Sequence, residues 1–133
     1  MKSVLLVEDH QKFASVLIRM LGGTNSFKVT RHVGTAELAL EHLLNQKFDL
    51  ALVDVFLPLM SGITLVGLIH KEYPLLPCLM LSGHMLGHYV EKSLAAGAHG
   101  YVLKDDAAGI LEGIQSIMRG KIYVSKELRY NGR

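Results

Sequence analysis

Residues 48–62 read FDLALVDVFLPLMSG and contain a short apolar strand that ends in an acid. Every side chain from Leu50 to Val53 is apolar, so both faces of the strand need to be buried, as in a parallel sheet covered by helices on both sides. Asp54 ends this run, and Pro58 then turns the chain away from the strand. The stretch therefore predicts a central strand of an α/β fold with a polar group at its carboxyl end.

The same pattern recurs on either side of this stretch, where short apolar runs alternate with longer amphipathic segments. Four further strands are predicted, at Ser3–Val7, Phe27–Val33, Cys78–Leu81 and Gly100–Leu103. Such alternation is typical of repeated βα units. It predicts an α/β fold of the flavodoxin-like, doubly wound type, with a five-stranded parallel sheet in the order 2-1-3-4-5 and helices on both faces.

The amphipathic segments predict five helices. One face of the first carries Phe13, Val16, Leu17, Met20 and Leu21, and this helix ends at Gly22 and Gly23. The second follows a cap at Thr35, and the third runs from about Ile63 to Ile69. Apolar residues at helical spacing define the last two, namely Leu86, Tyr89, Val90 and Leu94 in the fourth and Ile110, Leu111, Ile114 and Ile117 in the fifth.

The composition suits one domain that works in a reducing compartment. The chain has 133 residues, half of them apolar, and a net charge of +2 that gives no general attraction to nucleic acid. The single cysteine, Cys78, lies in an apolar run, and no apolar run has the length of a signal-peptide core or a membrane span. We expect a cytoplasmic protein with no membrane contact. Its domain would occupy residues 1–120, and residues 121–133, with a cap-like Ser125, would begin a linker or helix.

Polar residues stand where four of the five predicted strands end. Glu8 and Asp9 follow the first strand, Asp54 the third, Ser82 the fourth and Lys104 the fifth. The carboxyl ends of parallel strands share one edge of the sheet, where ligands bind in open α/β folds. We therefore expect these side chains to meet in one site.

Carboxylates that meet in one site need a cation. Each close pair repels by roughly 4 kcal/mol at an effective dielectric constant of 20. Mg²⁺ suits such a site because it accepts carboxylate oxygens and shares phosphate oxygens with a substrate. Asp54 could then act as the nucleophile of a phosphoryl transfer, with Lys104 and Ser82 binding phosphoryl oxygens.

Four motifs resemble those of two-component response-regulator receiver domains, over essentially the whole chain. They are VEDH at 7–10, FDLALVDVFLPLMSG at 48–62, LSGH at 81–84 and AGAHGYVLKD at 96–105. The resemblance implies a signalling domain, not an enzyme in the ordinary sense, that catalyses its own phosphotransfer and dephosphorylation. A histidine kinase or a phosphotransfer protein would supply the phosphoryl group.

The resemblance also assigns roles to individual residues. It implies that Asp54 is the phosphoacceptor and that Asp9, Asp54 and the backbone carbonyl of Phe56 bind Mg²⁺, with Glu8 acting through water. Lys104 and Ser82 would bind the phosphoryl group. Ser82 and Tyr101 would form a switch pair, in which Tyr101 rotates inward as Ser82 moves to the phosphoryl group, and the fourth helix and fifth strand would form the surface that is read out.

GAHGYVLKD and the later GKIYVSKEL look most like the LuxR-type (NarL/FixJ) subfamily. That likeness implies a transcriptional output through a helix-turn-helix domain that is not in this chain, with DNA bound only through that domain. A free-standing receiver that acts by protein–protein contacts is the alternative. Homodimer formation is left open.

Other interpretations of single residues remain. A Mg²⁺-dependent phosphohydrolase of the haloacid-dehalogenase type would need a second acid two residues after the nucleophile, where this chain has Phe56. A degenerate receiver that only binds partners would not need the full acidic and lysine set. Tyr101 could be an ordinary strand residue, and the spacing of His84 and His88 would fit a helical metal pair, although no further ligand accompanies them.

Overall fold

The computed structural model describes residues 1–83 and 87–132, with side chains described as far as Arg129. Within these residues the chain forms a six-stranded parallel sheet in the order β2-β1-β3-β4-β5-β6. The strands are β1 (Lys2–Val7), β2 (Phe27–Val33), β3 (Leu50–Asp54), β4 (Cys78–Ser82), β5 (Gly100–Leu103) and β6 (Tyr123–Val124).

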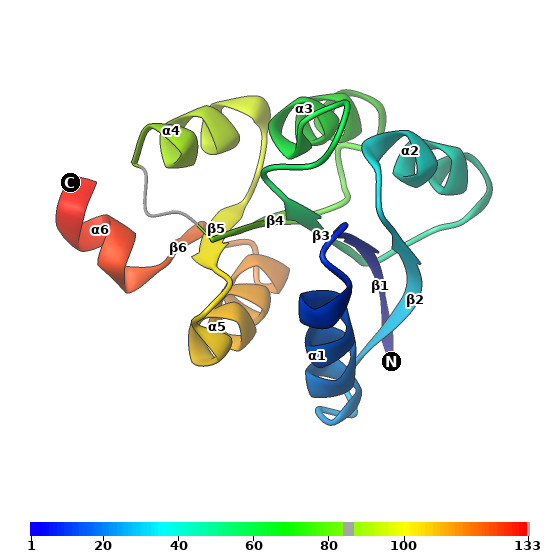
Figure 1. The fold of residues 1–133 in the computed structure, drawn as a ribbon, viewed down its shortest axis with the longest axis horizontal. Coiled ribbons are helices and arrows are strands. Elements are labelled where there is room, and N and C mark those ends of the chain that lie inside the picture. Colours follow the sequence, from blue (N-terminus) through cyan, green and yellow to red (C-terminus); the bar gives the residue numbers. More distant parts are fainter. Residues whose placement is uncertain (84–86, 133) are drawn as a thin grey trace.

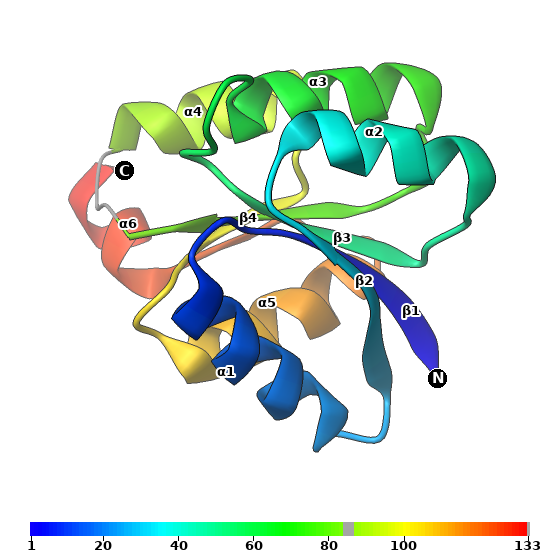
Figure 2. The ribbon, with the colours of Figure 1, turned by 45° about the vertical axis from the view of Figure 1, so that its right-hand side comes forward.

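Helices cover both faces of the sheet. The two views agree that α1 and α5 lie on one face and α2, α3 and α4 on the other, while α6 lies beside β6 and α4 (Figures 1 and 2). The helices are α1 (Gln11–Gly22), α2 (Ala36–Asn45), α3 (Gly62–Glu72), α4 (Gly87–Ala96), α5 (Ala107–Met118) and α6 (Lys126–Gly132).

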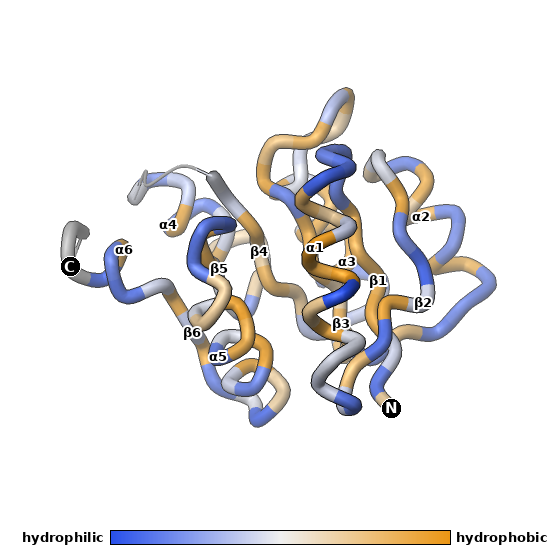
Figure 3. Tube along the Cα trace, turned by 60° about the horizontal axis from the view of Figure 1, so that its bottom comes forward, coloured by the Kyte–Doolittle hydropathy of each residue, from blue (hydrophilic) through white to orange (hydrophobic). Residues whose placement is uncertain are grey.

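An apolar core lies on each side of the sheet. Every residue of β3, β4 and β5 is buried. Successive residues of β3 point to opposite faces, so that Ala51 and Val53 join the core under α2, α3 and α4, whereas Leu50 and Leu52 join the core under α1 and α5. Burial on both faces explains why these strands are apolar without alternation. Figure 3 shows this contrast between the apolar central strands and the mixed helices.

Side-chain caps begin three of the helices close to the strand ends. Thr35 Oγ1 accepts a hydrogen bond from Leu38 N at 3.1 Å, and Asp106 Oδ1 accepts one from Gly109 N at 2.9 Å. Ser61 caps α3 in the same way. Each cap satisfies an N–H group that the first turn of a helix leaves without a partner, and so fixes where the helix begins.

The sequence-based prediction of the fold is confirmed for the five main strands and their order. Two details differ. α6 follows Ser125 in the segment predicted to begin a linker or helix, whereas β6 was not predicted and extends the sheet beyond β5. Val16, placed on the buried face of the first helix, is 59% exposed, because the buried stripe is centred on Ala14, Leu17 and Leu21. Leu86, predicted within the fourth helix, lies outside the described residues.

None of the helices in the part of the chain that the structure describes has the length and apolar character to cross a membrane.

Candidate functional site

The predicted site residues stand at the carboxyl ends of neighbouring strands. Val7, the last residue of β1, pairs with Val53 of β3, and Asp54 pairs with Leu81 of β4. Ser82 closes β4, and its carbonyl accepts a hydrogen bond from Lys104 N at 2.8 Å. The strand ends are therefore in register to within about one residue, which brings their polar side chains to one edge of the sheet.

Three acids meet at this edge. Glu8, Asp9 and Asp54 each offer a carboxylate oxygen, and these oxygens lie within 4.8 Å of one another. Glu8 is fully buried and Asp54 is 4% exposed, whereas Asp9 is exposed to solvent. The arrangement has two inner carboxylates and one that faces the water from which a ligand would enter.

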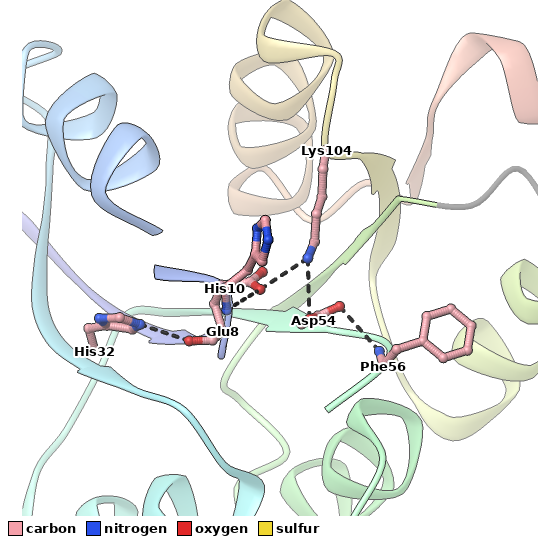
Figure 4. A network of polar contacts seen from close by, with 6 residues as sticks. All are labelled: Glu8, His10, His32, Asp54, Phe56 and Lys104. Carbon is pink, nitrogen blue, oxygen red and sulfur yellow. Dashed lines mark hydrogen bonds and ion pairs between the residues drawn. The ribbon is translucent and has the colours of Figure 1, made fainter. Parts of the chain in front are cut away.

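Lys104 supplies the positive charge in this cluster. Its Nζ lies 3.0 Å from Glu8 Oε2 and 3.2 Å from Asp54 Oδ2, so that one ammonium group joins acids from two strands (Figure 4). The same Nζ lies 5.1 Å from the centre of the Phe13 ring, within the range of a cation–π interaction. Lys104 thus lies next to the carboxylate of Asp54, the nucleophile that the sequence predicts.

Backbone groups orient the two buried carboxylates. Phe56 N donates to Asp54 Oδ1 at 3.1 Å, and His10 N donates to Glu8 Oε2 at 3.1 Å. His32 Nε2 lies 2.8 Å from the carbonyl oxygen of Glu8, which fixes this ring nitrogen as the donor (Figure 4). Both oxygens of Asp54 therefore have defined partners, one from the following loop and one from Lys104.

The surroundings of Glu8 disfavour the charged form of its carboxyl group. The pKa of its carboxyl is raised from 4.5 to about 7, first by burial and then by the charge of Asp54, while the hydrogen bond from Lys104 acts in the opposite direction. Among the described residues, no hydrogen-bond donor reaches Glu8 Oε1. A buried carboxylate oxygen without a partner is costly, so this atom fits a site that is completed by a metal-bound water.

Ser82 and Tyr101 occupy the interior beside the cluster. Both residues are fully buried, Ser82 at the end of β4 and Tyr101 in the middle of β5. Burial raises the pKa of the Tyr101 phenol, and the nearby Ser82 hydroxyl acts in the opposite direction. Within the described part of the chain, no hydrogen bond of ordinary geometry reaches the phenolic oxygen. Because Tyr101 is fully buried, its ring lies in an inward position.

The family comparison decides between the functional classes. A family model described as "Response regulator receiver domain" matches residues 4–115, which is most of the chain. The chain belongs to the response regulator receiver family. The predicted resemblance is thereby confirmed, and the receiver interpretation is preferred over a phosphohydrolase.

Curated relatives of this receiver are regulators of transcription. It is 29% identical over 129 residues to the transcriptional regulatory protein DegU of Brevibacillus brevis, which covers 96% of this chain and 55% of DegU. It is 32% identical over 127 residues to the transcriptional activator protein ExaE of Pseudomonas putida, which covers 94% of this chain and 59% of ExaE. The receiver thus spans a little over half the length of these relatives.

Solved structures share its fold. A LuxR-family two-component response regulator from Aurantimonas sp. SI85-9A1 superimposes with a TM-score of 0.93 at 24% identity, over 98% of this chain and 94% of that one. The signal receiver domain of the NarL regulator from Mycobacterium tuberculosis gives 0.84 at 26% identity, over 90% and 98%. These superpositions establish the fold of the receiver.

Two contacts of the receiver's site were not foreseen from its sequence. Phe13 was assigned only to the buried face of α1, and His32 was given no role. His32 reaches Glu8 because the pairing of β1 and β2 shifts register between Val4 and Leu5. No local pattern reports such a shift. His84, whose spacing to His88 would fit a helical metal pair, lies outside the described residues.

Proposed function

We propose that this receiver accepts a phosphoryl group on Asp54 from a phosphohistidine of a histidine kinase or phosphotransfer protein, and that the modified domain switches an output. The observation that carries the proposal is the setting of Asp54, a nearly buried carboxylate at a strand end. Its Oδ2 is paired with Lys104, and its Oδ1 accepts from Phe56 N. A nucleophile needs this fixed direction, and the phosphorylated product needs a cation beside it.

Mg²⁺ fits the residues around Asp54. Asp9 and Asp54 would bind it through carboxylate oxygens and Phe56 through its backbone carbonyl, with Glu8 acting through water. Support comes from the carboxylate oxygens that meet within 4.8 Å and from Glu8 Oε1, which no described donor reaches. When bound, Mg²⁺ would neutralise the charge that gathers on the carboxylates and on the oxygens of the transferring group.

The protein's own groups would take part in two steps, transfer of the phosphoryl group to Asp54 and its hydrolysis. One oxygen of Asp54 attacks phosphorus as the P–N bond of the donor breaks, and the departing imidazole keeps the electron pair and takes up a proton. The ammonium group of Lys104 exchanges the Asp54 carboxylate for a phosphoryl oxygen as its partner, and the Ser82 hydroxyl donates a hydrogen bond to another phosphoryl oxygen. Dephosphorylation is attack by water at the same phosphorus: the bond between phosphorus and the Asp54 oxygen breaks, inorganic phosphate leaves with the water oxygen, and Asp54 returns as a carboxylate.

The switch would use the two buried residues next to the site. Drawing Ser82 toward the phosphoryl group leaves room behind it, which the ring of Tyr101 fills. The proximity of Tyr101 to Ser82 supports this pairing, and the ring already lies inward in the structure, so phosphorylation would hold it there. Phosphorylation would then be read from the surface formed by α4 and β5.

The output that we propose is control of transcription. DegU and ExaE are named as transcriptional regulators, and this chain spans 55% and 59% of their lengths. The domain would comprise residues 1–120, followed by residues 121–133 leading to a DNA-binding helix-turn-helix, with homodimer formation as a further expectation. A free-standing receiver is the alternative. A cytoplasmic location agrees with Cys78, a buried free thiol whose pKa burial raises to about 12.

Labelling by acetyl phosphate tests the proposal. In the presence of Mg²⁺ the wild-type chain should gain one phosphoryl group, detected by intact-protein mass spectrometry, and chelation of the metal should prevent the gain. Asp54→Asn should remain unlabelled, whereas Asp105→Asn, which changes an exposed acid next to Lys104, should be labelled normally. Equal labelling of Asp54→Asn and wild type would refute Asp54 as the acceptor.

A further inference from the structure

The segment Tyr123–Arg129, which includes β6 and the first turn of α6, is bonded to β5 and is named the C-terminal strap. Tyr123 N donates to His99 O at 3.1 Å, and Ser125 N donates to Tyr101 O at 2.9 Å. These are the bonds of a parallel ladder, so the strap continues the sheet past β5. The edge of the strand that holds Tyr101 is therefore covered by the chain itself.

Ser125 is the residue that joins the two halves of the strap. Its hydroxyl oxygen accepts from Leu103 N at 3.0 Å, in the place where a further β6 residue would offer a carbonyl. Its own carbonyl accepts from Leu128 N at 3.0 Å and Arg129 N at 3.1 Å, which begins α6. Ser125 is fully buried, so each of these bonds replaces one that water cannot make.

The strap also packs on the side of β5 that faces α4. Leu128 is 3% exposed and belongs to the same apolar cluster as Val90 of α4 and Tyr101 and Leu103 of β5. Tyr123 donates from its hydroxyl to Glu112 Oε1 at 3.1 Å on α5. Figure 1 shows α6 at this end of the molecule, beside β6 and α4. The strap thus lies over the surface that the proposed switch would change.

The strap is bonded to the strand that carries the switch. Its ladder bonds reach Tyr101 O and Leu103 N, and Lys104, which contacts Asp54, is the next residue. In the structure the docked strap coexists with an inward Tyr101. Leu128 packs in the same apolar cluster as Tyr101, on the α4 side of β5. Docking of the strap therefore favours the inward ring.

We propose that the C-terminal strap is a regulatory element whose docking on β5 and α4 and the phosphorylation of Asp54 strengthen each other. The inference rests on the proposed function, in which phosphorylation also favours the inward Tyr101. Two events that stabilise the same state are coupled, and the coupling is reciprocal. The coupling depends on Ser125, because this residue is hydrogen-bonded both to Leu103 of β5 and to the first turn of α6.

Hydrogen exchange measured by NMR on the whole chain tests this coupling. Mg²⁺ and beryllofluoride, an analogue of the phosphoryl group, should slow exchange of the amides of Ser125, Leu128 and Leu103 by about 5-fold to 150-fold, the usual range of allosteric coupling. Fluorine NMR reports binding of the analogue separately. Binding without slower exchange in the strap would overturn the coupling alone. Failure to bind would overturn the proposed function, and the coupling with it.

A pair of variants separates coupling from simple packing. Ser125→Ala should lower the affinity for beryllofluoride by the factor by which the analogue slows strap exchange in wild type, although Ser125 does not contact Asp54 in the structure. Lys126→Ala, at an exposed neighbouring position, should bind the analogue as wild type does. If Ser125→Ala does not fold, Leu128→Ala tests the α6 side in the same way. Wild-type affinity in a folded Ser125→Ala would overturn the proposal.

Discussion

Replacing Lys104 by methionine would remove the cation from the acidic cluster and keep most of its apolar stem. The lysine lies 3.0 Å from Glu8 and 3.2 Å from Asp54, and both acids are almost inaccessible to solvent. Removing one partner of a buried ion pair costs about 3–5 kcal/mol. Because the Lys104 side chain is 20% exposed, solvent screens part of its charge, and we expect a loss of about 2–3 kcal/mol at about pH 8 without divalent cations.

The size of this loss should depend on pH and on Mg²⁺. The pKa of Glu8 is raised to about 7, so at about pH 6 Glu8 is mostly protonated and Lys104 stabilises mainly Asp54. The cost of the substitution should then fall by about half. Mg²⁺ should still bind to Lys104→Met and should recover part of the lost stability, because it brings its own positive charge to the same carboxylates.

Urea unfolding followed by circular dichroism, at both pH values and with either a chelator or Mg²⁺, measures these effects. Lys121→Met, at an exposed position outside the cluster, is the matched control and should change stability by less than about 0.5 kcal/mol. An equal loss of stability for Lys104→Met under all four conditions would show that Lys104 does not stabilise the charged carboxylates of Glu8 and Asp54.

Three further substitutions test other parts of the site. Glu8→Gln tests the pH dependence of stability. The pKa of Glu8 is raised from 4.5 to about 7 on folding, so between these pH values the folded chain holds a proton that the unfolded chain has lost, and the wild type loses stability as pH rises, by at most about 3 kcal/mol. In the presence of a chelator, the variant should not show this loss. For Gly62→Ala, an added Cβ would collide with the backbone carbonyl of Asp54, and thermal unfolding should show a loss of about 1–3 kcal/mol together with weaker phosphorylation. Ser82→Ala should still be labelled by acetyl phosphate, but the NMR shifts of Tyr101 should respond less to beryllofluoride, and an unchanged response would exclude Ser82 from the switch.

The main sheet could be predicted because its strands carry the information locally. Leu50–Asp54 and Cys78–Ser82 are buried on both faces, which requires apolar runs, and the polar residues that end them mark the edge of the sheet. Parallel strands with helical crossovers then leave few arrangements. The meeting of Glu8, Asp9 and Asp54 at one edge follows from the same rule, and the structure shows it.

The details that were missed depend on contacts between distant segments. β6 has only two residues, and its neighbour Ile122 is 63% exposed, so no periodic pattern predicts a strand there. Its pairing is completed by the Ser125 hydroxyl on Leu103 N, a bond across the sheet that the sequence gives no means of inferring. His32 likewise reaches Glu8 only through the register shift between β1 and β2.

A crystal structure of the chain with Mg²⁺ and beryllofluoride is the most direct test of Asp54 as the phosphoacceptor. We predict beryllium bonded to a carboxylate oxygen of Asp54, a metal ion bound by Asp9 and Asp54, and Lys104 Nζ moved from the carboxylate to a fluorine. Beryllofluoride attached to another residue, or a metal ion bound away from Asp9 and Asp54, would contradict the account.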